Sequence, residues 1–107
     1  MNKYGEISLP IDVNDEDTLF VLCIIAYFGS SLTDDTFRSV CQKKGIKLTR
    51  FKEIVNELYD KGLTTQRSYY WNYFYGTVRP SYYFTVVFLL LDQHPDWVKF
   101  FENLSAR

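Results

Sequence analysis

The chain lacks several features that would assign it to a common functional class. Its one histidine, His94, stands beside Pro95 without the Cys, His or carboxylate spacing of a metal site. Nucleotide-binding glycine loops, HExxH pairs and nucleophile elbows do not occur. The adjacent carboxylates Asp34 and Asp35 fit the start of a helix better than an acid–base couple. We therefore expect neither an enzyme nor a cofactor-binding protein.

Long apolar runs and a secretory leader are also missing. The longest apolar runs cover residues 19–28 and 82–91, short of the roughly 18 residues that a membrane span needs. The N-terminus lacks the basic-then-apolar order of a signal peptide. Cys23 and Cys41 fall in apolar periodic segments, which predicts small buried side chains, with a disulfide as the lesser alternative. These observations predict a cytoplasmic protein without a membrane segment.

Charge is distributed unevenly along the 107 residues, although the formal net charge is only −1. Residues 1–35 hold seven acids against Lys3 alone, and no acid lies between Asp35 and Glu53. That acid-free stretch creates a local positive field that attracts phosphate or an acidic partner surface. The alternative interpretation is that these bases lie on a solvated helix face without a partner. Its six bases, called the basic block below, are Arg38, Lys43, Lys44, Lys47, Arg50 and Lys52.

The order of apolar and turn residues predicts a single domain of several helices and one hairpin. The segment 81–93 reads as a helix because thirteen residues is long for a strand, but its β-branched and aromatic content leaves a buried strand as the alternative. The predicted elements are helices over 16–28, 34–44, 49–60, 81–93 and 97–104, and a hairpin over 63–79.

Two of these helices carry further expectations. The first is apolar on most sides, so it should be the central one, capped by Asn14 or Asp15. The third is expected to begin at a capping Thr49 and to bury one apolar stripe. That stripe consists of Phe51, Ile54, Val55 and Leu58.

This order of elements resembles the winged helix-turn-helix family over about residues 16–80. The stretch 48–63 carries the resemblance, because a leucine-containing last helical turn is followed by Gly62 and then by the apolar Leu63. The resemblance implies an α+β, mainly helical fold of three helices plus a β-hairpin wing with C-terminal helices. An acidic leader over 1–15 would precede this core, and an extension over 81–107 would pack on the core or on a partner.

Binding of double-stranded DNA is the function that the resemblance implies first, in a transcription regulator or a DNA-facing module of a larger protein. Helix 49–60 would enter the major groove with Thr49 and Asn56 as base-edge readers. Lysines at the preceding turn would contact phosphates. The implied DNA-contacting residues are Lys43, Lys44, Lys47, Thr49, Arg50, Lys52, Asn56, Arg67 and Arg79.

The rival hypothesis is a protein-interaction or dimerisation module without DNA binding. It is favoured by the acids Glu53, Glu57 and Asp60 on the same helix and by a pI near 5.7. The aromatic cluster 69–75 either covers its own sheet or forms a partner surface. We expect a homodimer or protein partner to use this aromatic wing or the C-terminal helices. In the last helix the apolar residues at helical spacing are Trp97, Phe100, Phe101 and Leu104.

Overall fold

The computed structural model describes residues 9–12, 14–29, 34–65, 69–70, 73–74 and 77–105, with the backbone alone at 34, 35, 38, 69, 70, 73, 74 and 105. Within these residues the chain forms five helices and one pair of very short strands. The helices are α1 (Glu16–Phe28), α2 (Asp34–Lys44), α3 (Leu48–Asp60), α4 (Pro80–Gln93) and α5 (Pro95–Ser105). The strands are β1 (Tyr69–Tyr70) and β2 (Tyr73–Phe74).

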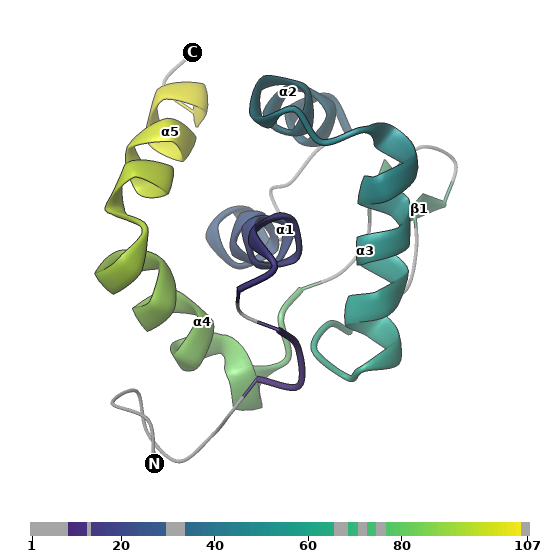
Figure 1. Ribbon diagram of the computed structural model, residues 1–107, viewed down its shortest axis with the longest axis vertical. Coiled ribbons are helices and arrows are strands. Elements are labelled where there is room, and N and C mark those ends of the chain that lie inside the picture. The colour runs from purple at the N-terminus through teal and green to yellow at the C-terminus, as the bar shows by residue number, and fades with distance from the viewer. Residues whose placement is uncertain are drawn as a thin grey trace.

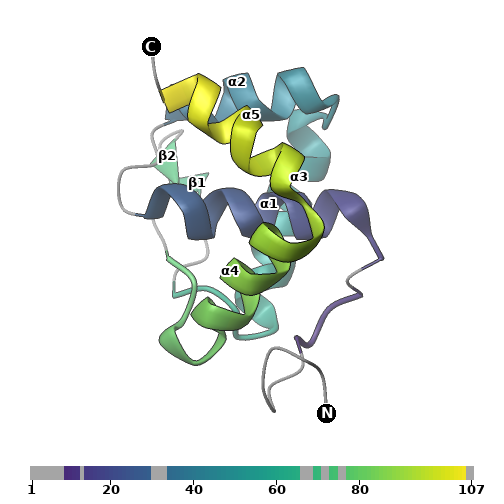
Figure 2. The same ribbon diagram turned by 90° about the vertical axis from the view of Figure 1, so that its left-hand side faces the viewer.

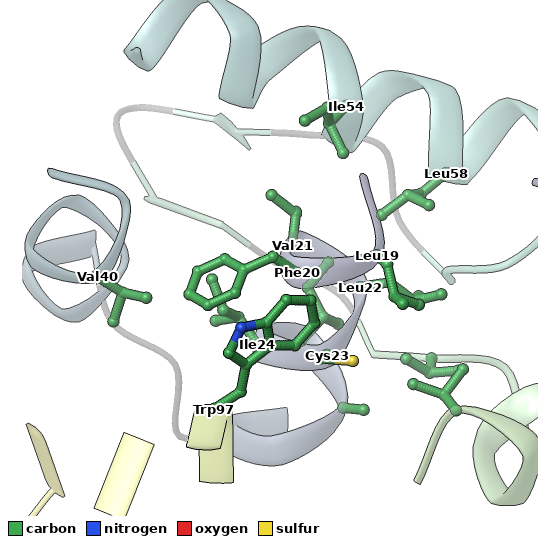
Figure 3. Packing of buried hydrophobic residues seen from close by; sticks show 14 of the residues in the cluster. Leu19, Phe20, Val21, Leu22, Cys23, Ile24, Val40, Ile54, Leu58 and Trp97 are labelled. Carbon is green, nitrogen blue, oxygen red and sulfur yellow. The ribbon is translucent and has the colours of Figure 1, made fainter. Parts of the chain in front are cut away.

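Helix α1 lies at the centre of the molecule, as its apolar composition predicts. Figure 1 shows it end-on with the other four helices around it. Asp15 caps its start by accepting a hydrogen bond from the Thr18 amide, and Gly29 follows its last turn. All nine residues over 18–26 are buried. Figure 3 shows how side chains from the surrounding elements, including Val40, Ile54 and Trp97, point toward this helix.

Helices α2 and α3 end in the same way. At the end of α2 the Ile46 amide donates to the Cys41 carbonyl at 2.9 Å, while Gly45 has φ of +87°. At the end of α3 the Leu63 amide donates to the Leu58 carbonyl at 2.9 Å, and Gly62 has φ of +77°. Both are Schellman motifs, in which a left-handed glycine lets the chain turn back over the helix end.

The apolar stripe of α3 is confirmed, because Phe51, Ile54, Val55 and Leu58 are all buried. The expected cap is wrong. The helix begins at Leu48, the N-cap position is Lys47 without a side-chain cap bond, and Thr49 lies inside the first turn. A capping hydroxyl must precede the first helical residue, and here the N-cap lies two residues earlier than the expected Thr49.

Residues 80–93 form a helix, which confirms the preferred interpretation of that segment. Pro80 takes the first helical position, where its missing amide hydrogen costs nothing. The inner face of α4 buries Thr85, Val86, Leu89 and Leu90, and α4 packs against α1 and α5. Figure 2 shows α4 and α5 crossing in front of α1.

Helix α5 closes the core on the side opposite α3. Trp97 and Phe101 are buried, and their rings lie 5.0 Å and 5.5 Å from the ring of Phe20 on α1. Phe100 and Leu104 pack against the same core and are partly buried. These four apolar residues of α5 therefore belong to the interior of this chain.

The predicted α+β winged helix is wrong, because the described part of the chain is mostly helical, with five helices and two strands of two residues each. Among the described residues, strands pair at Tyr69↔Phe74 and Tyr70↔Tyr73, and an isolated bridge joins Thr64 and Val78. Strands of two residues offer no sheet face that could pack on the helices, and an isolated two-stranded hairpin is marginal in water. The Thr- and Tyr-rich composition favoured a wing, but the helices supply nearly all of the core. The fold is a five-helix domain built around α1.

Candidate interaction surfaces

The start of α1 lies against the basic block and neutralises part of it. The Lys44 ammonium is 2.7 Å from a Glu16 carboxylate oxygen. The Arg50 guanidinium is 3.1 Å from Asp15 and 3.6 Å from Glu53. Acids that are 28 and 35 residues away in sequence thus face bases of α2 and α3. Lys44 and Arg50 therefore already have carboxylate partners within the fold.

The ionisation of both acids responds to these contacts. Burial acts to raise the pKa of Asp15, but hydrogen bonds from Thr18 and the charge of Arg50 outweigh it, so the pKa lies below its usual value. The pKa of Glu16 is also lowered, first by its hydrogen bond with Lys44 and then by the Lys44 charge. Both groups are therefore more firmly ionised in the folded chain than in the unfolded one.

Lys44 has aromatic neighbours as well. Its ammonium lies 5.3 Å from the ring centre of Phe20 and 5.5 Å from that of Trp97, within the range of a cation–π interaction. His94 stacks on Trp97 with ring centres 3.6 Å apart and planes 8° from parallel. Lys44 therefore contacts α1 and α5 from its position on α2. To contact a phosphate, its ammonium group would have to leave Glu16 and the two aromatic rings.

The remaining predicted DNA-contacting residues are mostly exposed. Arg67 lies outside the described residues, as does the side chain of Arg38. Lys43, Lys47 and Lys52 surround the α2–α3 turn, and Lys52 makes a further contact of its own. The exposed members of the predicted set are Lys43, Lys47, Thr49, Lys52, Asn56 and Arg79.

Acids share the outward side of α3 with these residues. Glu53 and Asp60 are exposed, and Glu57 is 3.2 Å from Lys61. The Lys52 positive charge is thus followed within one or two turns by negative charges. A duplex lying along the whole helix would meet this acidic half, so only the start of α3 offers a positive surface.

A hollow of about 430 Å³ lies beside the α2–α3 turn, lined by Cys41, Gln42, Ile46, Lys47 and Leu48. Burial raises the pKa of the Cys41 thiol to about 12, with a smaller contribution from the charge of Asp17. Burial also raises that of Cys23 to about 12. Both cysteines are free and buried, as the sequence predicted, and both thiols stay protonated and unreactive at neutral pH.

Several large apolar side chains are exposed on α4; the sequence placed a possible partner on the C-terminal helices but did not single out these residues. Phe84, Phe88 and Leu91 are 69%, 49% and 56% exposed, and the neighbouring Tyr83 is 41% exposed. These four residues are called the outer face of α4 below. No described element lies in front of this helix in Figure 2. A usable signal was present, because 81–91 is apolar around the whole helix and one core can cover only one side.

Other kinds of site find no support in the described part of the chain. No group of three His, Cys, Asp or Glu side chains there is placed to hold a metal ion. Among the helices described, none combines the length and apolar character needed to cross a membrane. Comparison of the chain with protein-family models, curated proteins and solved structures gives no match.

Proposed function

We propose that this domain is a protein-interaction module that docks through the outer face of α4. The observation that carries the proposal is the exposure of Phe84, Phe88 and Leu91 on a helix whose opposite side is already buried in the core. A helix that is apolar all round normally lies inside a protein. Covering the second side of α4 with a partner would complete its burial.

The size of the surface agrees with a docking role. Aromatic side chains bury about 150–250 Å² each, so the exposed fractions of Tyr83, Phe84 and Phe88 leave roughly 300 Å² of aromatic surface in water. Leu91 raises the total to about 400 Å². Apolar patches of roughly 300–600 Å² are the largest that monomers usually show, and such patches are often functional.

A photoreactive phenylalanine analogue in place of Phe84 tests this proposal in the cells that make the protein. Irradiation should yield a covalent adduct with a protein, because a partner that covers α4 lies against this side chain. The same analogue at Leu48, which is 45% exposed on α3, is the matched control and should give no such adduct. Identical adducts from both positions, or none from position 84, would contradict a docking role for α4.

Contact with double-stranded DNA is a second candidate function. It is favoured by one observation, the exposure of Lys43, Lys47 and Lys52 together with Thr49 and Asn56 around the α2–α3 turn. Lys43 and Lys47 alone predict a slope of roughly −2 in a plot of log affinity against log salt concentration, since each phosphate contact contributes about −0.9. The pairing of Lys44 and Arg50 with acids excludes the steeper slope that all six bases would give.

A titration of random duplex DNA at two salt concentrations tests this second function. Lys47→Ala should make the slope shallower by about 1, because one phosphate contact is lost. Lys99→Ala removes an exposed lysine of α5, outside the basic block, and should leave the slope unchanged. Absence of binding at low salt, or equal effects of the two substitutions on the slope, would contradict DNA binding by this surface.

A further inference from the structure

We infer that Asp15 and Glu16 restrain the positive surface at the α2–α3 turn, because they hold Arg50 and Lys44 in ion pairs that a phosphate has to break. The inference rests on the second candidate function, contact with double-stranded DNA, and names how that contact is regulated. It is carried by two ion pairs, by the way Asp15 is fixed in place and by the position of the two held bases, Lys44 and Arg50.

The two held bases stand next to two exposed ones. Lys44 follows Lys43 in the last turn of α2, and Arg50 lies about one helical turn after Lys47, the residue that precedes α3. Lys43 and Lys47 are exposed, whereas Lys44 and Arg50 are half-buried. Release of the held bases would therefore add positive charge to a surface that already presents two lysines.

Each held base meets a carboxylate where a phosphate would bind. The Lys44 ammonium is 2.7 Å from Glu16, and the Arg50 guanidinium is 3.1 Å from Asp15. Carboxylate and phosphate oxygens accept hydrogen bonds from the same N–H groups of lysine and arginine. A phosphate that binds either base therefore competes with an acid of the same chain.

Asp15 is fixed in the position that this competition requires. Its Oδ1 atom accepts a hydrogen bond from the Thr18 amide at 3.3 Å, and its Oδ2 atom accepts one from Arg50. Helix α1 is buried over residues 18–26, so acids at its start keep their place relative to α2 and α3. The lowered pKa values of Asp15 and Glu16 agree with this role, because both carboxylates stay ionised at neutral pH.

The restraint is one that DNA can overcome, because both ion pairs are partly exposed. The side chains of Lys44 and Glu16 are 26% and 62% exposed, and those of Arg50 and Asp15 are each 39% exposed. Ion pairs at such positions are weak and are weakened further by salt. If Asp15 loses its charge, Arg50 keeps only the more distant and more exposed Glu53 among the carboxylates that pair with it here. The acids therefore limit how many bases reach phosphate without preventing DNA contact.

A titration of the full chain with random duplex DNA at several salt concentrations tests the restraint. The double variant Asp15→Asn, Glu16→Gln removes both charges and keeps a capping oxygen at residue 15. Its slope should steepen from roughly −2 to roughly −4, since each added phosphate contact contributes about −0.9. The matched control is Asp12→Asn, Asp17→Asn, which removes the same charge from the same segment. Among the described residues these two acids form no ion pair with a base, so the control should keep the wild-type slope.

Arg50→Ala shows directly whether a held base reaches phosphate. In the wild-type chain this substitution should leave the slope unchanged, because Arg50 is held by Asp15. In the Asp15→Asn, Glu16→Gln background it should make the slope shallower by about 1. Chemical denaturation of each variant shows that it is folded.

The outcomes separate the restraint from the function on which it rests. A wild-type slope in the Asp15→Asn, Glu16→Gln variant, or the same steepening in the control, would overturn the restraint and leave DNA binding in place. A shallower slope for Arg50→Ala in the wild-type chain would also overturn it, because Arg50 would then already contact phosphate. No binding by any of these proteins at low salt would contradict DNA contact itself, and the restraint with it.

Discussion

At the scale of single residues, Leu58 shows how burial sets the cost of a substitution. Its side chain is fully buried on the inner face of α3 and points toward α1 (Figure 3). Leu58→Ala removes three heavy atoms from a packed interior and should lower the free energy of unfolding by roughly 2–5 kcal/mol. Chemical denaturation measures the loss. A midpoint equal to that of the unsubstituted protein would show that α3 is rotated from the orientation described.

Asp15 joins a helix cap to an ion pair, and two substitutions separate these roles. Asp15→Asn keeps a capping oxygen for the Thr18 amide but loses the charge facing Arg50, so it should cost little. Asp15→Ala loses both and should cost about 1 kcal/mol. Thermal or chemical unfolding of the two variants at neutral pH makes the comparison. Equal losses in both variants would show that the Arg50 pair matters more than the cap.

The lowered pKa values of Asp15 and Glu16 also predict the pH dependence of stability. A carboxyl group whose pKa is lower in the folded chain stabilises it at pH values above the unfolded pKa. That contribution is lost as the pH falls through the folded pKa, which lies below the ordinary value of 3.8 for Asp15 and of 4.5 for Glu16. Unfolding free energies measured between pH 7 and about pH 2.5 should fall less steeply in the double variant Asp15→Asn, Glu16→Gln. A parallel decline in both proteins would contradict the pKa assignments.

The burial of single residues was predicted correctly from the sequence where it depends on the apolar pattern of neighbouring residues in the same helix. The inward residues of α3, such as Ile54, and the two buried cysteines follow from apolar periodicity. The pairing of Lys44 with Glu16 and of Arg50 with Asp15 did not follow, since each pair joins residues that only the tertiary fold brings together. For that reason the basic block looked more positive in the sequence than it is in the folded molecule.

At the scale of elements, the two Schellman motifs fix how α2 and α3 end. A Cβ added at Gly62 meets no atom within 4 Å, so Gly62→Ala would strain only the left-handed backbone. We expect a loss of about 1 kcal/mol in the free energy of unfolding. Gly62→Asn should cost less, because asparagine tolerates this conformation better. Denaturant titration of both variants checks the order, and an alanine variant as stable as the parent would contradict the left-handed turn.

Helix positions were predictable because each long segment carries its own periodicity and stop residues, as α1 with Asp15 and Gly29 illustrates. The extent of the β-hairpin wing was not predictable from the sequence. Residues 63–79 have strand-like composition, but composition does not say how far a ladder extends, and here the described strands pair over two residues each. The extension over 81–107 was predicted to pack on the core or on a partner, and α4 buries one side in the core while Phe84, Phe88 and Leu91 remain exposed on another.

At the scale of the whole molecule, the four outer helices enclose α1, and two exposed faces of the described residues differ in character. One is the positive surface at the α2–α3 turn, where Lys43 and Lys47 are exposed. The other is the outer face of α4, which is apolar and uncharged. DNA binding by the first face would weaken as salt rises, because it would depend on phosphate contacts. Docking on the second would depend on hydrophobic burial and would be unchanged or strengthened as salt rises.

The most direct test of the account is capture of a partner by the outer face of α4 in the cells that make the protein. A photoreactive phenylalanine analogue in place of Phe84, which is 69% exposed, should give a covalent adduct with a protein. The same analogue in place of Leu48, which is 45% exposed on α3, should give no such adduct. No adduct from position 84, or the same adducts from both positions, would contradict the account.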